Sequence, residues 1–411
     1  MESDITTPNR DDALRVTVGG LELGKVEKQY LSEVIDSNRL SYGRFSRQFE
    51  SLFAEQHDCR FAVFCNSGTS ALHIALAALK ETHGWCDDDE VLVPAVTFVA
   101  TSNIVLHNRM TPVFVDVDPH TYNIDPSQIE EKITPRTRAI IPVHLMGLPA
   151  DMVEIDQIAR RHSLKVIEDS CETMFADCHG KKVGSWGEIG CFSTYIAHYI
   201  TTGVGGFATT NDPELAVMLR SLMNHGRDAI YLSIDDDDAC SADHLKEVVA
   251  RRFNFVHLGH SFRCTELEAA VGLAQLERKD GILSRRKAVA RQYCDVLSDL
   301  DHVLQLPTTP PGLEHVFMLF PLVVRDEHKR GLVNHLEQHG IETRDLLPLI
   351  NQPIYRKLYG DLESELPVAA WLNRSAFYIG CHQTIDESAI HHVAETIHGY
   401  FEQSARVHRA A

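Results

Sequence analysis

The segment FAVFCNSGTS, residues 61–70, decides the fold class that this sequence predicts. Its first four residues form a short apolar run that is typical of a buried β-strand. Small polar residues follow at 66–70, and a helical pattern runs from Ala71 to Leu79. A turn of this kind points backbone N–H groups and hydroxyls at an anion on the positive end of the helix. By itself such a turn is often only a chain reversal, so the anion site needs support from the rest of the chain.

The alternation of strand and helix continues outward from this segment over about 200 residues. Further strands are predicted at 91–94, 112–117, 139–143 and 165–168, with helices such as 151–160 between them. This pattern predicts an α/β fold with a mostly parallel sheet covered by helices on both faces. One long amphipathic helix is predicted from Glu266 to beyond Ala290, and mixed strands and helices follow it. We therefore predict a large domain over residues 16–265 and a linking helix with a smaller C-terminal α/β domain over 266–411.

The composition limits the classes of partner. The chain has 411 residues and a formal net charge of −19, which disfavours nucleic acid and anionic lipid as main partners. No stretch approaches the length of an apolar membrane span, and residues 1–15 lack the apolar core of a signal peptide. Ten scattered cysteines fit reduced thiols better than a disulfide framework. These features predict a cytoplasmic protein, in which an anionic substrate would need a locally basic pocket.

Two other strand ends carry residues suited to binding a ring. Asp169 follows the strand predicted at 165–168, and in a pyridoxal 5'-phosphate (PLP) site an aspartate keeps the pyridine nitrogen protonated so that the ring accepts electrons. Phe98 follows the strand at 91–94, where an aromatic ring could stack on the cofactor. Each residue alone also fits an ordinary role, since an acid after a strand often caps a loop and an aromatic residue is often core.

The combination and order of these segments are much more specific than any one of them. From about Leu23 to Phe401 the chain resembles the DegT/DnrJ/EryC1/StrS sugar-aminotransferase family. The resemblance is carried by NSGTSAL at 66–72, VPAVTFVAT at 93–101, PVFVDVD at 112–118, PVHLMG at 142–147, EDS at 168–170, GVGG at 203–206 and NHG at 224–226. It implies a type I aminotransferase fold, bound PLP, and a homodimer with its active sites at the subunit interface.

The resemblance also assigns roles to single positions. Contacts to the cofactor phosphate are implied for Gly68, Thr69, Ser193 and, from the neighbouring subunit, Asn224. Phe98 matches the ring-stacking aromatic residue, and Asp169 matches the partner of the pyridine nitrogen. Glu172, where the aminotransferases usually have glutamine and some dehydratases an acid, could contact the ring or simply be an acid near a loop. For the substrate, Tyr42 lies in the segment LSYG (40–43), which resembles a loop beside the sugar. Three arginines, Arg227, Arg251 and Arg263, are candidates for binding a nucleotide diphosphate. Only Arg263 falls in a segment that resembles the family, so we rank it first.

His198 stands where the aminotransferases have the lysine that carries the cofactor covalently. In this respect STYIAHYITTGVGG (193–206) resembles the nucleotide-sugar 3-dehydratases, a branch that includes GDP-4-keto-6-deoxymannose 3-dehydratase. An imidazole cannot form the stable covalent link, but its pKa near 6.5 suits proton transfer at neutral pH. Lys181 and Lys182 fall too early in the chain to replace the lysine. We therefore expect PLP and its amine form, pyridoxamine 5'-phosphate (PMP), to bind non-covalently.

These residues lead to the hypothesis of a dehydratase, a lyase of deoxysugar biosynthesis. It would act on a nucleotide-linked 4-keto-6-deoxy sugar and give a 3-deoxy sugar, with His198 as the base. Glutamate would restore PMP as the amino donor, or an electron-transfer partner would reduce the unsaturated adduct. Two alternatives stay open. One is an aminotransferase-like enzyme of another reaction type, and the other is a non-catalytic paralogue that binds the cofactor in a regulatory role. Val204, where the family usually has glutamate before Gly205, leaves the activity less certain.

One dehydratase subgroup also holds a [2Fe–2S] cluster on four cysteines. Cys171 matches one ligand position, but the close-spaced trio expected later is missing, since only Cys240 lies in that interval and Cys264 just after it. Cys171, Cys178 and Cys191 are too widely spaced for a compact metal motif. We therefore expect no metal and no iron–sulfur cluster.

Overall fold

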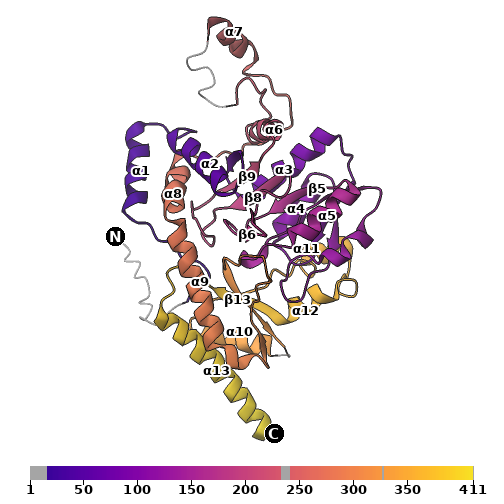
Figure 1. The fold of residues 1–411 in the computed structure, drawn as a ribbon, viewed down its shortest axis with the longest axis vertical. Helices are drawn as coiled ribbons and strands as arrows, with labels where there is room; N and C mark the ends of the chain where they lie inside the picture. The colour runs from indigo at the N-terminus through magenta and orange to yellow at the C-terminus, as the bar shows by residue number, and fades with distance from the viewer. Residues whose placement is uncertain (1–15, 233–240, 326–327, 411) are drawn as a thin grey trace, which may run out of the picture.

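The computed structural model describes residues 16–232, 241–325 and 328–410. Two main sheets organise it, and in Figure 1 the larger sheet with its helices lies above the smaller one. This arrangement confirms the predicted α/β fold with a larger, mostly parallel sheet and a smaller C-terminal α/β part.

The larger sheet has seven strands. In spatial order they are β1 (Phe61–Cys65), β9 (Gly206–Thr210), β8 (Ile189–Ser193), β5 (Lys165–Asp169), β4 (Thr137–Ile140), β2 (Glu90–Pro94) and β3 (Thr111–Val115). The strands from β8 to β3 pair in parallel, whereas β9 is antiparallel to both β1 and β8. Since the carboxyl ends of parallel strands meet at one edge, the turns after β2 and β5 lie close together.

Successive residues of the central strands belong to opposite faces of the larger sheet. Leu92, Ile140 and Val166 pack with Ile155 and other residues of α5 on one face. Their neighbours along each strand belong to the other face, which α3 covers together with α4. The strands are therefore buried on both sides, which explains their nearly continuous apolar sequences.

Helices and short elements complete the larger part. They are α1 (Lys25–Ser37), α2 (Arg44–Gln56), α3 (Gly68–His83), α4 (Val99–His107), η1 (Pro126–Gln128), η2 (Glu130–Lys132), η3 (Leu145–Gly147), α5 (Met152–His162), the hairpin β6 (Asp177–Cys178) and β7 (Lys181–Lys182), α6 (Pro213–Met223) and α7 (Ala242–Arg251). Figure 1 shows α7 projecting beyond the rest of the chain. Among the helices that the structure describes, none is both long enough and apolar enough to span a bilayer.

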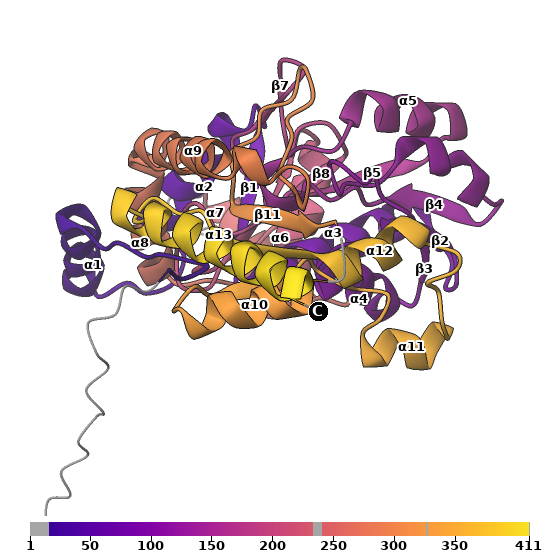
Figure 2. The ribbon, with the colours of Figure 1, turned by 90° about the horizontal axis from the view of Figure 1, so that it is seen from below.

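The smaller sheet is antiparallel. Its strands are, in spatial order, β10 (Leu304–Gln305), β11 (Leu319–Val324), β13 (Ala376–Gly380) and β12 (Thr343–Asp345). The other elements are η4 (Ser298–Leu300), α10 (Lys329–Gln338), α11 (Pro353–Tyr359), α12 (Pro367–Ser375) and α13 (Glu387–Ala410). Figure 2 shows α13 and α10 lying across this sheet, and Phe320, Leu322 and Phe377 fill the core beneath them.

The single long helix predicted after Glu266 is two helices, α8 (Glu266–Glu277) and α9 (Lys279–Val296). Arg278 interrupts them with a non-helical ψ of 13°, and its guanidinium lies 2.7 Å from the Glu27 carboxylate. Because α8 stays packed on α1 and α2, the break lets α9 run on to the smaller sheet (Figure 1). The prediction of one continuous helix was therefore wrong, while the domain boundary at 265/266 stays a prediction.

Candidate active site

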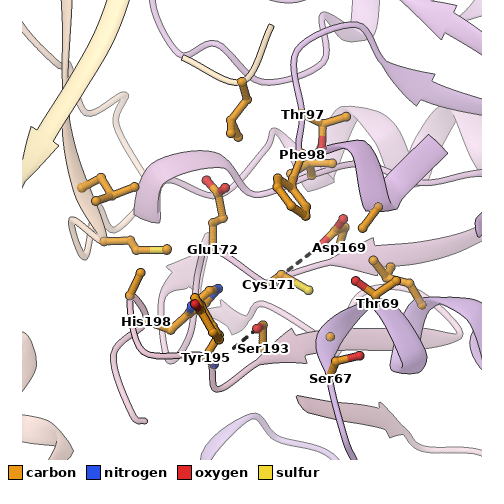
Figure 3. A pocket seen from close by; sticks show the side chains of 18 of the residues that line it. Ser67, Thr69, Thr97, Phe98, Asp169, Cys171, Glu172, Ser193, Tyr195 and His198 are labelled. Atoms are coloured by element: carbon orange, nitrogen blue, oxygen red, sulfur yellow. Dashed lines mark hydrogen bonds between the residues drawn. The ribbon is translucent and has the colours of Figure 1, made fainter. Parts of the chain in front are cut away.

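A cavity of about 410 Å³ lies where the two sheets meet (Figure 3). Of the predicted site residues, its walls include Gly68, Thr69, Phe98, Asp169, Glu172, Ser193 and His198. The smaller sheet and the segments beside it add Met318, Leu319, Leu347 and Tyr378. Residues as far apart in the sequence as Gly68 and Tyr378 therefore share one site.

The phosphate cradle predicted at 66–70 forms the start of α3. The Ser67 hydroxyl accepts a hydrogen bond from Ser70 N at 3.0 Å and caps the helix. The first N–H groups of a helix have no partner within it, so those of Gly68 and Thr69 are available to an anion in the cavity. At Gly68, a Cβ would lie 2.6 Å from Cys171 Sγ and 2.8 Å from Ser193 Cβ. Glycine is therefore needed for Ser193 to approach the helix start.

Asp169 and Phe98 form the part of the cavity that suits a flat heteroaromatic ring. Asp169 is buried, and its carboxylate accepts hydrogen bonds from Thr101 Oγ1 at 2.7 Å and from Cys171 N at 3.1 Å. Burial raises the pKa of Asp169 and the hydrogen bond from Thr101 opposes this, so a protonated ring nitrogen would be a favourable partner. Phe98 is 58% exposed although it is apolar, and Figure 3 shows its ring beside Asp169 at the cavity.

His198 lies in the turn that follows β8. Its backbone N–H donates a hydrogen bond to Tyr195 O at 2.9 Å, and its backbone carbonyl accepts one from Arg286 Nη2 at 3.1 Å. Figure 3 shows the imidazole and Phe98 on different sides of the cavity. Nδ1 is buried without a hydrogen-bond partner among the described residues. Burial lowers the pKa of His198 to about 4, and the positive charge of Arg286 acts in the same direction. The imidazole is therefore neutral at physiological pH, which is the form of histidine that can accept a proton, and its burial makes it a weaker base than an exposed imidazole.

Glu172 lies on the cavity wall, above His198 and across from Asp169 in the view of Figure 3. Its carboxylate accepts a hydrogen bond from Met146 N at 3.0 Å. Burial raises the pKa of Glu172 to about 7. At neutral pH this group can therefore either donate or accept a hydrogen bond to a bound molecule.

Three of the predicted site residues lie elsewhere. Tyr42, Asn224 and Arg263 line a second pocket of about 810 Å³, and the first cavity includes none of them among its lining residues. Arg263 Nη1 donates to Asn224 Oδ1 at 2.7 Å. Arg47, Arg220 and Arg227 also line this pocket, so it is strongly basic within an acidic chain.

Two of these arginines, Arg47 and Arg220, lie outside the sequence motifs that indicated the site. Arg220 donates to both Glu50 and Tyr42, at 2.9 Å and 3.1 Å. Nothing local marks Arg220, because its partners lie about 170 positions away. Arg251, one of the three candidates for the substrate, instead pairs with Asp228 at 2.7 Å and does not line the pocket.

Comparison with known proteins agrees with this geometry. Residues 22–398 match the DegT/DnrJ/EryC1/StrS aminotransferase family. The chain belongs to this family. One relative, the GDP-perosamine synthase of Caulobacter vibrioides, is 36% identical over 391 residues, which cover 93% of this chain and 97% of the relative. The fold is thus that of the type I PLP-dependent aminotransferases, and the protein is a PLP-dependent sugar-modifying enzyme.

Solved structures in the same family include dehydratases. The structure of the E. coli GDP-4-keto-6-deoxy-D-mannose-3-dehydratase with bound hydrated PLP superposes with a TM-score of 0.85 at 26% identity, covering 94% of this chain and 100% of that one. A GDP-4-keto-6-deoxymannose-3-dehydratase with glutamate trapped on PLP gives a TM-score of 0.84 at 26% identity, covering 93% and 100%. The chain is therefore similar both to a GDP-perosamine synthase and to dehydratases.

No lysine lines the first cavity, as far as the described residues show. Lys181 lies over the Trp186 ring at 4.7 Å, and Lys182 donates to Phe175 O at 3.0 Å. Both side chains are engaged in the β6–β7 region, which agrees with the inference that neither replaces the family's lysine. Val204, at the position of the usual glutamate, lines the cavity and is half exposed.

The cysteines were expected not to hold a cluster, and this stays a prediction. Cys171 lines the cavity, while Cys178 and Cys191 are buried. In the part of the chain that the structure describes, no three His, Cys, Asp or Glu side chains are arranged to hold a metal ion. Cys240 lies outside the described residues.

Proposed function

We propose that this enzyme is a nucleotide-sugar 3-dehydratase that binds PLP and PMP non-covalently. Its substrate is a nucleotide-linked 4-keto-6-deoxy sugar, and its product is the 3-deoxy sugar. The observation that carries the proposal is His198: a neutral imidazole, whose buried Nδ1 has no hydrogen-bond partner among the described residues, lines the cavity at the family's lysine position. Such a group can move protons but cannot hold the cofactor covalently.

Each residue of the cavity has a separate role in this proposal. When bound, the cofactor supplies an amino group and an electron sink. Gly68, Thr69 and Ser193 would hold its phosphate at the start of α3. Phe98 would cover the ring, Asp169 would pair with the ring nitrogen, and Glu172 would contact the ring edge. His198 takes up a proton on its imidazole and can later release it.

An aminotransferase acting on the same class of nucleotide sugar is the second candidate. The 36% identity to a GDP-perosamine synthase favours it. Ordinary transamination in this family depends on a lysine in the cavity, and the lining residues offer none. The cavity chemistry therefore favours the dehydratase. A purely regulatory role is disfavoured because the phosphate cradle and Asp169 accompany a proton acceptor.

The two candidates differ in their stoichiometry, and this provides the test. Replacing C3–OH by C3–H is a two-electron reduction, so each dehydration would consume one glutamate as the reductant and release its amino nitrogen as ammonia. We expect glutamate to convert the absorption of bound PLP to that of PMP. Adding a GDP-linked 4-keto-6-deoxy sugar should then give a product that lacks one oxygen, together with one equivalent of ammonia. An amino sugar formed without release of ammonia would establish the aminotransferase instead.

The proposed assembly is a homodimer in which the second pocket of one subunit faces the first cavity of the other. This would bring Asn224 to the cofactor phosphate, and Tyr42 and Arg263 to the substrate. The basic lining of the second pocket suits a nucleotide diphosphate. The homodimer would also account for the division of the predicted site residues between two pockets of one chain.

Hybrid dimers should reveal this arrangement. His198→Asn and Asn224→Ala are each expected to lower activity, but a hybrid of the two has one complete site. Random pairing at equal amounts gives half hybrids, so roughly a quarter of the wild-type activity should return. Co-expression with two different tags and an assay of the mixture would measure it. Activity equal to the sum of the separate variants would show that Asn224 acts within its own subunit.

A further inference from the structure

Arg286, on α9, is one of the largest fully buried side chains of the protein. Burying a guanidinium is costly unless its charge and donors are satisfied. Yet no carboxylate lies within ion-pair distance of Arg286 in the described ranges, and its Nε has no partner there. A buried cation without a counter-charge indicates that its position is required for something other than pairing.

The guanidinium instead joins three backbone carbonyls from both parts of the molecule. Nη1 donates to Met318 O at 2.7 Å and to Cys381 O at 3.2 Å; these residues directly precede β11 and directly follow β13 of the smaller sheet. Nη2 donates to His198 O at 3.1 Å. The planar fork of arginine can reach such divergent acceptors, whereas a lysine ammonium cannot match that geometry.

The same guanidinium also lies against the residue after His198. Its centre is 5.0 Å from the Tyr199 ring centroid, within the range of a cation–π contact. The Tyr199 hydroxyl in turn donates to Glu172 O at 3.1 Å. Arg286 therefore contacts both His198 and Tyr199, and through Tyr199 it reaches the segment that carries Glu172.

His198 depends on this backbone support, because its imidazole Nδ1 makes no hydrogen bond among the residues described. A general base must be held within a fraction of an ångström of its working position. We propose that Arg286 is a positioning residue: it fixes the His198 carbonyl to the smaller sheet and so sets the imidazole in the cavity. The proposal rests on the proposed function, in which His198 is the base.

Arg286→Lys and Arg285→Lys form a matched pair for the test. Arg285 is the next residue of α9 and donates to Ile385 O at 2.5 Å, so it also ties α9 to the smaller part but does not contact His198. For Arg286→Lys we expect kcat to fall by about 10- to 100-fold, with KM for the nucleotide sugar and the affinity for PLP nearly unchanged. Arg285→Lys should keep the wild-type kcat. Equal kcat for both variants, after correction for the folded fraction, would overturn the proposal.

A second measurement needs no substrate. In protein labelled with ¹³C at histidine Cε1, the signal that His198→Asn removes identifies His198. Arg286→Lys should shift or broaden this signal in the PLP-bound enzyme, and Arg285→Lys should leave it in place. An unchanged signal in Arg286→Lys would contradict positioning whatever the reaction is. If the wild type converts no 4-keto sugar but the signal moves, the proposed function fails while the role of Arg286 in placing His198 stands.

Discussion

His198→Asn is expected to lower kcat by about 10²- to 10⁴-fold, the usual contribution of a general base. Asparagine keeps a polar side chain of smaller size but cannot take up a proton. The phosphate cradle and Asp169 are unaffected by the change, so PLP should still bind and show its absorption spectrum. Stopped assays for the deoxygenated product, together with a spectrophotometric titration of PLP, would measure both effects.

His315→Asn is a suitable control for this experiment. His315 is also a buried imidazole near the junction of the two sheets, stacked 3.6 Å from the Phe317 ring, but it does not line the cavity. Burial lowers the pKa of His315 to about 3, so it too is neutral. Its replacement should reduce thermal stability and spare kcat. Full turnover by His198→Asn would exclude His198 as the base, and borohydride fixing PLP to any wild-type lysine would contradict non-covalent binding.

Asp169→Asn should produce the second large effect, a loss of about 10²- to 10³-fold in kcat. The asparagine is nearly isosteric, but it carries no charge to keep the ring nitrogen protonated, and the electron sink is weakened. A charge-assisted hydrogen bond contributes about 1.5–3 kcal/mol, so the affinity for PLP should fall as well. Titration of the variant with PLP and single-turnover assays at saturating PMP would separate the two losses.

Asp116→Asn provides the matched control for a buried carboxylate. Asp116 follows β3, is buried, and accepts hydrogen bonds from Val368 N and Ala369 N, both at 2.8 Å, at the start of α12. Its loss should weaken that helix cap and lower the melting temperature, with PLP binding and kcat unchanged. If Asp169→Asn behaved in the same way, Asp169 would be a structural residue and not the partner of the ring nitrogen.

Much of the fold followed from local sequence patterns. The apolar run at 61–64 lies within β1, and the small residues after it begin α3, because Ser67 is a good N-cap and Gly68 allows close packing. The predicted strands at 91–94 and 165–168 lie within β2 and β5. The break at Arg278 could not be predicted in this way, since it depends on packing against α1 and on Glu27, about 250 positions away.

Several residues of the cavity could be chosen from the sequence. Asp169 and Phe98 stand at predicted strand ends, and Gly68 lies in the turn before a predicted helix, whereas His198 was chosen from the family resemblance, because it stands at the position of the family's lysine. The protonation state of His198, by contrast, depends on burial and on Arg286, which sequence spacing does not reveal.

The sequence by itself determined the α/β class, since periodicity and turn residues are local properties, and the family resemblance indicated which chemical groups to expect at the site. Only the tertiary structure decided which of these groups meet. It gathers His198, Asp169 and Phe98 in one cavity, separates Tyr42, Asn224 and Arg263 into a second pocket, and places Arg286 behind His198. The physical reason is that these contacts join residues dozens to hundreds of positions apart, and such pairs are set by how the two sheets and α9 pack together.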